Sequence, residues 1–167
     1  MIRYLDPLVI QPKLIRASLF IAAFELLKDT VANYIHSVFG DNPNNHSILE
    51  MLEWFKENQV LNDEDLYAYK RLTDIRNELV HELAETIMSD KELFLEERFE
   101  EITNLLSKIE LWWIKSIEIP ANPDFDGKKI TDGEIESGNL ILLNILRDCA
   151  NGSTAYLDAW KILRKKI

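Results

Sequence analysis

Residues 62–88, NDEDLYAYKRLTDIRNELVHELAETIM, carry the clearest helical pattern in the chain. Asn62 is a favourable N-cap residue, and the three acidic residues that follow it suit the positive end of a helix dipole. Apolar residues then recur at steps of three and four, the period of one helix face: Leu72, Ile75, Leu79, Leu83 and Ile87. The pattern predicts one helix from Asn62 to about Met88, with this stripe towards the core.

The flanking sequence predicts further helices on both sides. Pro12 suits the first turn of a helix that Gly40 ends, and Ser47 with Glu50 forms a capping box for a short helix to about residue 58. Another capping box, Ser89 with Glu92, opens a helix that we expect to stop at Pro120. Two more helices are expected at 134–149 and 153–166. We therefore predict an all-α bundle of about five to six helices, a single domain spanning 1–167, with an irregular loop at about 120–133.

Composition agrees with this fold class. The 167 residues are 47% hydrophobic and include only 5 Gly and 5 Pro, a globular and turn-poor composition. Cys149 is the single cysteine, so no intramolecular disulfide can form and a reducing compartment fits best. The N-terminus lacks the apolar region of a signal peptide, and the apolar stretch 17–24 is far shorter than the roughly 20 residues that cross a bilayer. We expect a soluble, cytoplasmic protein without a membrane partner.

Charge limits the kinds of ligand. The net charge is −10, and residues 62–90 include three basic and eight acidic residues. Non-specific nucleic-acid binding depends mainly on neutralising phosphates, so this composition argues against it. A basic cluster near the C-terminus is typical of a solvated helix end: Lys161, Arg164, Lys165 and Lys166.

Two residues of the 62–88 helix, Arg76 and His81, together suggest chemistry on a phosphate. An arginine fork can hold two phosphate oxygens, and a histidine can exchange a proton near neutral pH. At about 100° per residue, Asn77 and His81 lie only about 40° apart and nearly opposite Leu79, so they point away from the core. Arg76 leaves the helix about 140° from His81, so a second copy of the helix would help to complete a site.

The order Arg76-Asn77-x-x-x-His81 resembles the R-X4-6-H signature of the HEPN superfamily. The resemblance implies a helical bundle that dimerises with its motif helices facing each other. Many such proteins are metal-independent endoribonucleases, often toxins or defence proteins, and they need no cofactor. By resemblance, His81 is the general acid or base, Arg76 stabilises charge on the phosphorus oxygens, and Asn77 orients the phosphate or the histidine.

Two departures keep a second hypothesis open. Leu83 stands where some HEPN toxins carry a tyrosine that a partner nucleotidyltransferase modifies, which argues against that antitoxin mechanism. Four acidic residues flank the motif and would repel RNA unless the fold turns them away: Asp74, Glu78, Glu82 and Glu85. The chain is therefore either a ribonuclease acting on an RNA substrate or a non-catalytic interaction or regulatory module that binds a protein partner.

Metal sites are weaker alternatives. Glu78 and His81 form a Glu-x-x-His pair, but a di-iron site needs a second pair, and neither His36 nor His46 follows a glutamate at that spacing. The zinc-protease pattern is incomplete too, because Glu85 replaces its second histidine.

The loop at 122–134 shares the first half of an EF-hand calcium loop. Asn122, Asp124 and Asp126 occupy positions one, three and five, and Gly127 occupies position six. The closing Glu134 falls one residue late. A calcium loop and a surface turn at residues 126–127, or a small hairpin, are the alternatives.

Trp113 continues the stripe of Leu106 and Ile109, which indicates packing in the core or at a dimer interface in preference to base stacking. Cys149 follows Ile145 and Leu146 on an apolar face, which predicts a buried structural thiol.

Overall fold

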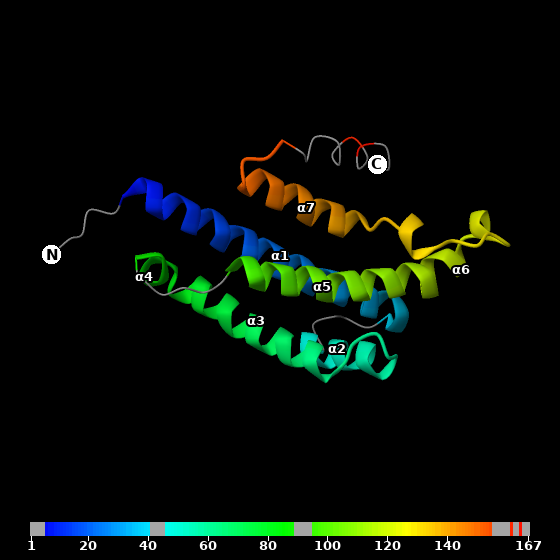
Figure 1. The fold of residues 1–167 in the computed structure, drawn as a ribbon. Helices are drawn as coiled ribbons and strands as arrows, with labels where there is room; N and C mark the ends of the chain where they lie inside the picture. Colours follow the sequence, from blue (N-terminus) through cyan, green and yellow to red (C-terminus); the bar gives the residue numbers. More distant parts are fainter. Residues whose placement is uncertain (1–5, 41–45, 89–94, 155–160, 162–163, 165–167) are drawn as a thin grey trace.

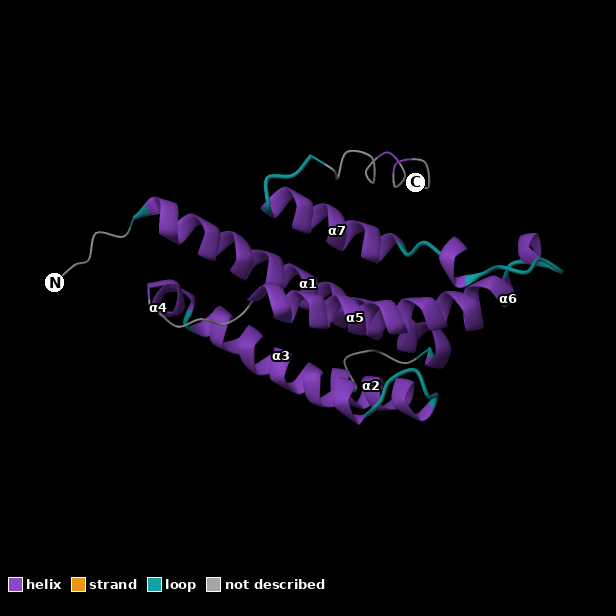
Figure 2. Ribbon diagram, in the orientation of Figure 1, coloured by secondary structure: helices purple, strands orange, loops and turns teal. Residues whose placement is uncertain are grey.

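The computed structural model describes residues 6–40, 46–88 and 95–154, together with Lys161 and Arg164. Every regular element within these residues is helical and none is a strand, so the all-α prediction is confirmed (Figure 2). The long helices α1 (Pro7–Phe39), α3 (Asp63–His81) and α5 (Leu95–Trp113) lie roughly side by side. The shorter helices α2 (Ile48–Glu57) and α7 (Gly138–Ala150) pack against α1 (Figure 1).

Helix α1 begins earlier than expected. Asp6 is its N-cap, with a carboxylate that accepts from the backbone N–H of Leu8, and Pro7 occupies the first turn. The prediction that Pro12 starts the helix is wrong, because Pro12 lies inside it, near an exposed end where one missing N–H is tolerated. The predicted stop is confirmed. Gly40 adopts a left-handed conformation (φ +67°), and its N–H bonds to the carbonyl of His36 at 2.8 Å.

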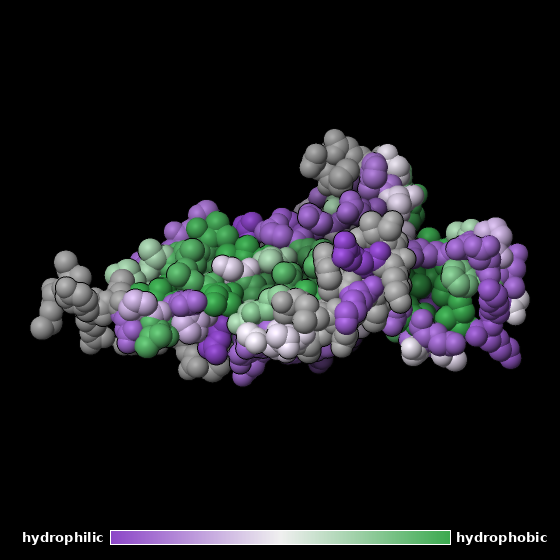
Figure 3. All heavy atoms as spheres, turned by 90° about the horizontal axis from the view of Figure 1, so that it is seen from above, coloured by the Kyte–Doolittle hydropathy of each residue, from purple (hydrophilic) through white to green (hydrophobic). Residues whose placement is uncertain are grey.

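Helix α1 is the centre of the core and contacts α2, α3, α4, α5 and α7. It buries eight residues at helical spacing: Ala17, Phe20, Ala23, Phe24, Leu27, Thr30, Val31 and Ile35. Towards its N-terminal end, apolar residues reach the surface (Figure 3), and Leu8, Val9 and Leu14 are exposed. By length and composition alone α1 also meets the requirements of a membrane span, with an 18-residue window of mean hydropathy 1.3. A core helix meets the same requirements.

Helix α3 confirms the predicted start but not the predicted end. Asn62 and Asp65 form a reciprocal capping box, with both hydrogen bonds at 3.0 Å. The helix ends at His81, and after a bend at Glu82 the short helix α4 (Leu83–Met88) begins. The prediction of one continuous helix to Met88 is therefore wrong.

The bend at Glu82 lets α4 pack back on α1. The Glu82 N–H still bonds to the carbonyl of Glu78, and the Glu82 carbonyl accepts from Thr86, both at 2.8 Å. Lys13 of α1 donates to the carbonyl of Ile87 at 3.3 Å, which anchors α4 from the opposite side. Within the predicted stripe Leu72, Leu79 and Ile87 are buried, whereas Ile75 and Leu83 are partly buried.

The other helices follow local signals in part. The capping box of Ser47 and Glu50 starts α2 as predicted, whereas the predicted box at residues 89 and 92 lies outside the described residues. Helix α5 continues through a π-helical segment, Ile114–Glu118, into the short α6 (Ile119–Ala121). Pro120 therefore sits in the first turn of α6, a tolerated position, and the helical path ends one residue beyond it.

The segment after α6 is irregular, as expected. It contains two 3₁₀ turns, Pro123–Phe125 and Asp132–Glu134, and Gly127 is left-handed (φ +72°). No strand occurs in this loop, so the small hairpin does not form. Helix α7 begins at Gly138, after its cap Ser137, instead of at residue 134. The expected last helix lies mostly outside the described residues.

A buried polar cluster joins α7 to the bundle. The carboxylate of Glu110, on α5, is only 3% exposed and accepts hydrogen bonds from Ser137 and Asn139, each at 2.7 Å. Burial, followed by the charge and hydrogen bond of Glu110, raises the pKa of Tyr34. Trp113 stacks on Tyr34 with ring centroids 4.1 Å apart, which confirms that this tryptophan packs in the core.

Candidate functional site

Asn77 and His81 lie one turn apart on the outer face of α3, and both are exposed. Leu79, between them in sequence, is 1% exposed and faces the core. The predicted outward direction of this pair is confirmed. Helix α3 lies along the lower edge of the molecule in Figure 1, with no described helix drawn below it.

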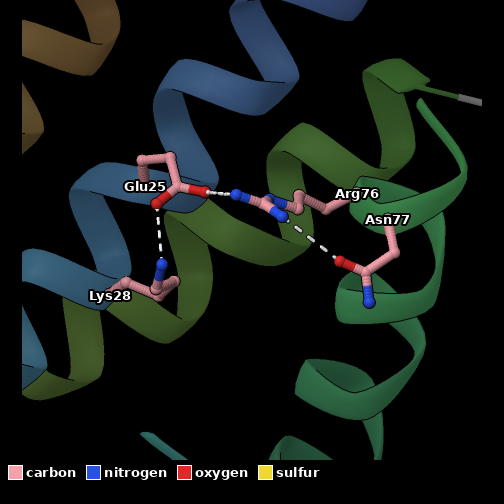
Figure 4. Close-up of polar contacts among 4 residues, drawn as sticks. All are labelled: Glu25, Lys28, Arg76 and Asn77. Atoms are coloured by element: carbon pink, nitrogen blue, oxygen red, sulfur yellow. Dashed lines mark hydrogen bonds and ion pairs between the residues drawn. The ribbon is translucent and has the colours of Figure 1, made fainter. Parts of the chain in front are cut away.

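Arg76 points towards α1 instead, where it pairs with Glu25 (Figure 4). Its Nε and Nη2 atoms both donate to Oε1 of Glu25, at 2.9 and 2.6 Å. The Arg76 side chain is 27% exposed and that of Glu25 33% exposed, so the pair lies at the edge of the core. Charge-assisted bonds from one edge of a planar guanidinium hold it in a defined orientation.

Arg76 also reaches the outer face of its own helix. Its third nitrogen, Nη1, donates to Oδ1 of Asn77 at 3.3 Å. Helical angles alone separate Arg76 from His81, but the long side chain bends back far enough to join Asn77. The structure thus brings Arg76 and Asn77 together. No hydrogen bond links His81 to either of them within the described residues.

Lys28 completes a charged cluster with Glu25 and Arg76. It donates to Oε2 of Glu25 at 2.8 Å, so the two carboxylate oxygens serve different cations. Partial burial raises the pKa of Glu25, but hydrogen bonds and charges from Lys28 and Arg76 outweigh it and leave the pKa below its ordinary value. Two cations and one carboxylate leave the cluster with a net positive charge.

Sequence reasoning missed Glu25 and Lys28. A signal was present, because Glu25 is the first charged residue after the uncharged stretch 17–24 in the helix that forms the core. A charge on a core helix needs a partner. Nothing local in the sequence identifies that partner as Arg76, since the two residues are 51 positions apart.

The acidic residues around the motif are not all turned away. Asp74, Glu82 and Glu85 are exposed, whereas Glu78 is partly buried. Exposed carboxylates lower the local concentration of a polyanion such as RNA. Phosphate attraction at the motif therefore has to come from nearby cations, and Arg76 and Lys28 provide two of them.

The loop at 122–134 uses two of its candidate calcium ligands as local caps. Oδ1 of Asn122 accepts from the N–H of Asp124 at 3.0 Å, and Oε2 of Glu134 accepts from the N–H and Oγ1 of Thr131, both at 2.8 Å. Within the described residues, no group of three or more His, Cys, Asp or Glu side chains could hold a metal ion. Calcium binding at Asn122, Asp124, Asp126 and Glu134 stays a prediction.

Cys149 is exposed, so the prediction of a buried thiol is wrong. It lies in the last turn of α7, whereas the buried residues of that helix, Leu143 and Ile145, come earlier. The apolar face of α7 therefore extends to Cys149 in the sequence, but only its earlier part is buried against the other helices.

No protein-family model, curated protein or solved structure matches this chain. The assignment of a function therefore rests on side-chain geometry and on the motif. Among the described residues, the contacts of Arg76 are the most specific geometric feature near that motif.

Proposed function

We propose that this protein is a metal-independent endoribonuclease of the HEPN type, in which Arg76, Asn77 and His81 carry the site. The hydrogen bond between Arg76 and Asn77 is the observation that supports this best. Arg76 leaves α3 on a different side from His81. Its hydrogen bond to Asn77 brings the positively charged guanidinium towards the face of α3 on which His81 lies.

Each side chain has a chemical role in this proposal. Arg76 binds non-bridging phosphate oxygens and stabilises the charge that grows on them. Because Oδ1 of Asn77 already accepts from Arg76, its amide N–H groups are left to donate to the phosphate. His81 takes the proton of the ribose 2′-hydroxyl as its oxygen attacks phosphorus, or gives a proton to the leaving 5′-oxygen as the P–O bond breaks.

A second feature of α3 favours contact with RNA. Tyr67 is 67% exposed, and the guanidinium of Arg71 lies 5.7 Å from its ring centroid. Both residues line a groove of about 830 Å³ between α3 and α5. Its lining also contains the acidic residues Asp63, Glu64, Asp65 and Glu101, so the groove offers a base a stacking surface and not a net positive charge. An exposed aromatic ring beside an arginine provides a stacking surface for an unpaired base. Tyr67 lies on the same side of α3 as His81, about 21 Å away along the helix.

The proposal includes a homodimer through the outer face of α3. Exposed residues follow this face at alternating steps of four and three: Asp63, Tyr67, Lys70, Asp74, Asn77 and His81. If two copies pair antiparallel about position 72, Lys70 lies opposite the partner's Asp74, and Asp63 lies opposite the partner's His81. Opposite charges then meet near the middle of the stripe, where each Lys70 faces an Asp74.

A non-catalytic interaction module is the second candidate. The exposed carboxylates of Asp74, Glu82 and Glu85 favour it, because they suit a basic protein partner better than RNA. In that case the pairing of Arg76 with Glu25 is a structural contact between α3 and α1.

RNA cleavage in the presence of EDTA distinguishes the ribonuclease from the non-catalytic interaction module. We expect the wild type and His46→Ala to cleave an unstructured RNA at the same rate, and His81→Ala to lose activity. His46 is a matched control because it is another exposed histidine. Equal cleavage by wild type and His81→Ala would refute the assignment of His81, and absence of cleavage by both would favour the interaction module.

A further inference from the structure

We propose that Glu25 is a positioning residue of this site, which holds the guanidinium of Arg76 in the orientation that binds phosphate. The inference rests on the proposed function, because it assigns a role within the same site. Glu25 lies on α1, far in sequence from the motif, and its contacts with Arg76 suggest the role.

The contacts show which part of the guanidinium is held. Nε and Nη2 lie on one edge of the planar group, and both donate to the same oxygen of Glu25. Two bonds on one edge fix the plane as well as the position of the group. Nη1 lies on the other side and faces Asn77. Glu25 therefore occupies the inner edge of Arg76 and leaves Nη1 towards the outer face of α3.

The second oxygen of Glu25 explains why this pairing does not cancel the charge of Arg76. Lys28 binds Oε2, so one negative charge is shared between two cations. The positive charge that remains can attract a phosphate. An arginine paired alone with a carboxylate would be neutralised, whereas this cluster orients the arginine and stays cationic.

The carboxylate is attached to a rigid part of the fold. Its neighbours Phe24 and Leu27 are 2% and 0% exposed, so this turn of α1 is fixed by the core. Phe24 also stacks on Tyr69 of α3, with ring centroids 5.6 Å apart. Core packing thus sets the spacing between α1 and α3 that the Glu25–Arg76 contact requires. Supporting residues on rigid helices give the most precise sites.

If Glu25 competed with phosphate for Arg76 instead of positioning it, the same variants would behave in the opposite way. A carboxylate that merely occupies Arg76 would compete with phosphate, so its removal would strengthen RNA binding and would not slow cleavage. A carboxylate that positions Arg76 does the reverse. The same variants therefore separate the two roles.

The kinetic test compares Glu25→Ala, Glu25→Gln and the matched control Glu53→Ala. Glu53 is an exposed residue of α2, so its replacement causes the same change in net charge away from the site. We expect Glu25→Ala to lower kcat about 10- to 100-fold, as is typical when the support of a functional group is removed. KM should change less. Glu25→Gln, which keeps an oxygen acceptor of the same shape, should recover part of the loss, and Glu53→Ala should match the wild type.

An uncleavable RNA analogue gives the binding measurement. An oligonucleotide with 2′-deoxy sugars lacks the nucleophile, so its affinity can be measured without turnover. We expect Glu25→Ala to bind it no more tightly than the wild type. Tighter binding by Glu25→Ala, or cleavage equal to that of the wild type, would overturn the positioning role.

Nuclear magnetic resonance separates this inference from the proposed function. The Nε–H signal of Arg76, assigned by its loss in Arg76→Lys, should be protected from exchange in the wild type and in Glu53→Ala. It should lose protection in Glu25→Ala. If the wild type cleaves no RNA, the proposed function fails, but this signal still decides whether Glu25 fixes the guanidinium. Unchanged protection in Glu25→Ala would refute the inference.

Discussion

Arg76 and Glu25 are 51 positions apart in sequence and are joined by two hydrogen bonds from one edge of the guanidinium, at 2.9 and 2.6 Å. The contact links the motif helix α3 to the core helix α1. It also makes the arginine of the motif a structural residue as well as a candidate for chemistry, so its replacement should affect both properties.

Arg76→Lys should therefore lower stability and activity together. A lysine cannot make both bonds to Glu25 and also reach Asn77, so we expect a loss of about 1 kcal/mol in the free energy of unfolding, measured with urea. Cleavage of RNA should fall about 100-fold. Arg147→Lys is a suitable control, because Arg147 forms a more exposed ion pair with Glu100. If Arg76→Lys were as stable and active as this control, the fork geometry would be irrelevant.

The lowered pKa of Glu25 predicts how its contribution to stability depends on pH. Its pKa in the folded state lies below the ordinary 4.5, so the ionised form is favoured by folding. The stability difference between wild type and Glu25→Gln should be fully present above about pH 5 and should shrink as pH falls through the lowered pKa. Urea titrations from about pH 7 to about pH 3 measure it. A difference that grows with acid would contradict the assignment.

Charge reversal tests the α3 dimer and its register. Neither Lys70 nor Asp74 has an ion-pair partner among the described residues, so both are available across an interface. Lys70→Asp and Asp74→Lys should each weaken self-association about tenfold, because each replaces two attractive pairs by repulsive ones. A mixture of the two variants should form heterodimers. Sedimentation velocity over a concentration series measures this.

The control for the dimer is Glu53→Lys, which changes the net charge as Asp74→Lys does, but on α2. It should associate like the wild type. A wild type that is monomeric at every concentration, or a mixture that forms no heterodimer, would exclude this register of α3.

Glu110→Ala should weaken the attachment of α7. The change removes the acceptor of the buried Ser137 and one of the two acceptors of the partly buried Asn139, which keeps Thr30. We expect a loss of about 2 kcal/mol in unfolding free energy. Glu110→Gln should lose less, because it keeps one acceptor oxygen. Glu118→Ala, an exposed site on the adjoining π-helical segment, is the comparison. Urea unfolding checks all three. Equal stability of Glu110→Ala and Glu118→Ala would show that the cluster does not hold α7.

Local signals account for the parts of the fold that sequence reasoning predicted. The capping box at Ser47, the N-cap at Asn62 and the helix end at Gly40 depend only on neighbouring residues, and each was predicted at the correct position. The outward direction of Asn77 and His81 follows from helical geometry alone. These features need no knowledge of the rest of the chain.

Long-range contacts account for the rest. No glycine or proline in the sequence predicts the bend at Glu82. Helix α4 is instead held by a hydrogen bond from Lys13 of α1. The pairing of Glu25 with Arg76 likewise depends on how α1 and α3 pack. A sequence pattern shows that a charge on the core helix needs a partner, but the choice among distant partners is made by the tertiary structure.

The end of α3 at His81 also changes which residues are neighbours on the surface. In a straight helix, Glu85 would lie one turn beyond His81 and directly beside it. The bend at Glu82 interrupts that helical spacing, because α3 ends at His81 and α4 begins at Leu83. The motif histidine and Glu85 therefore belong to two different helices, and of the two downstream carboxylates only Glu82 remains next to the histidine in the chain.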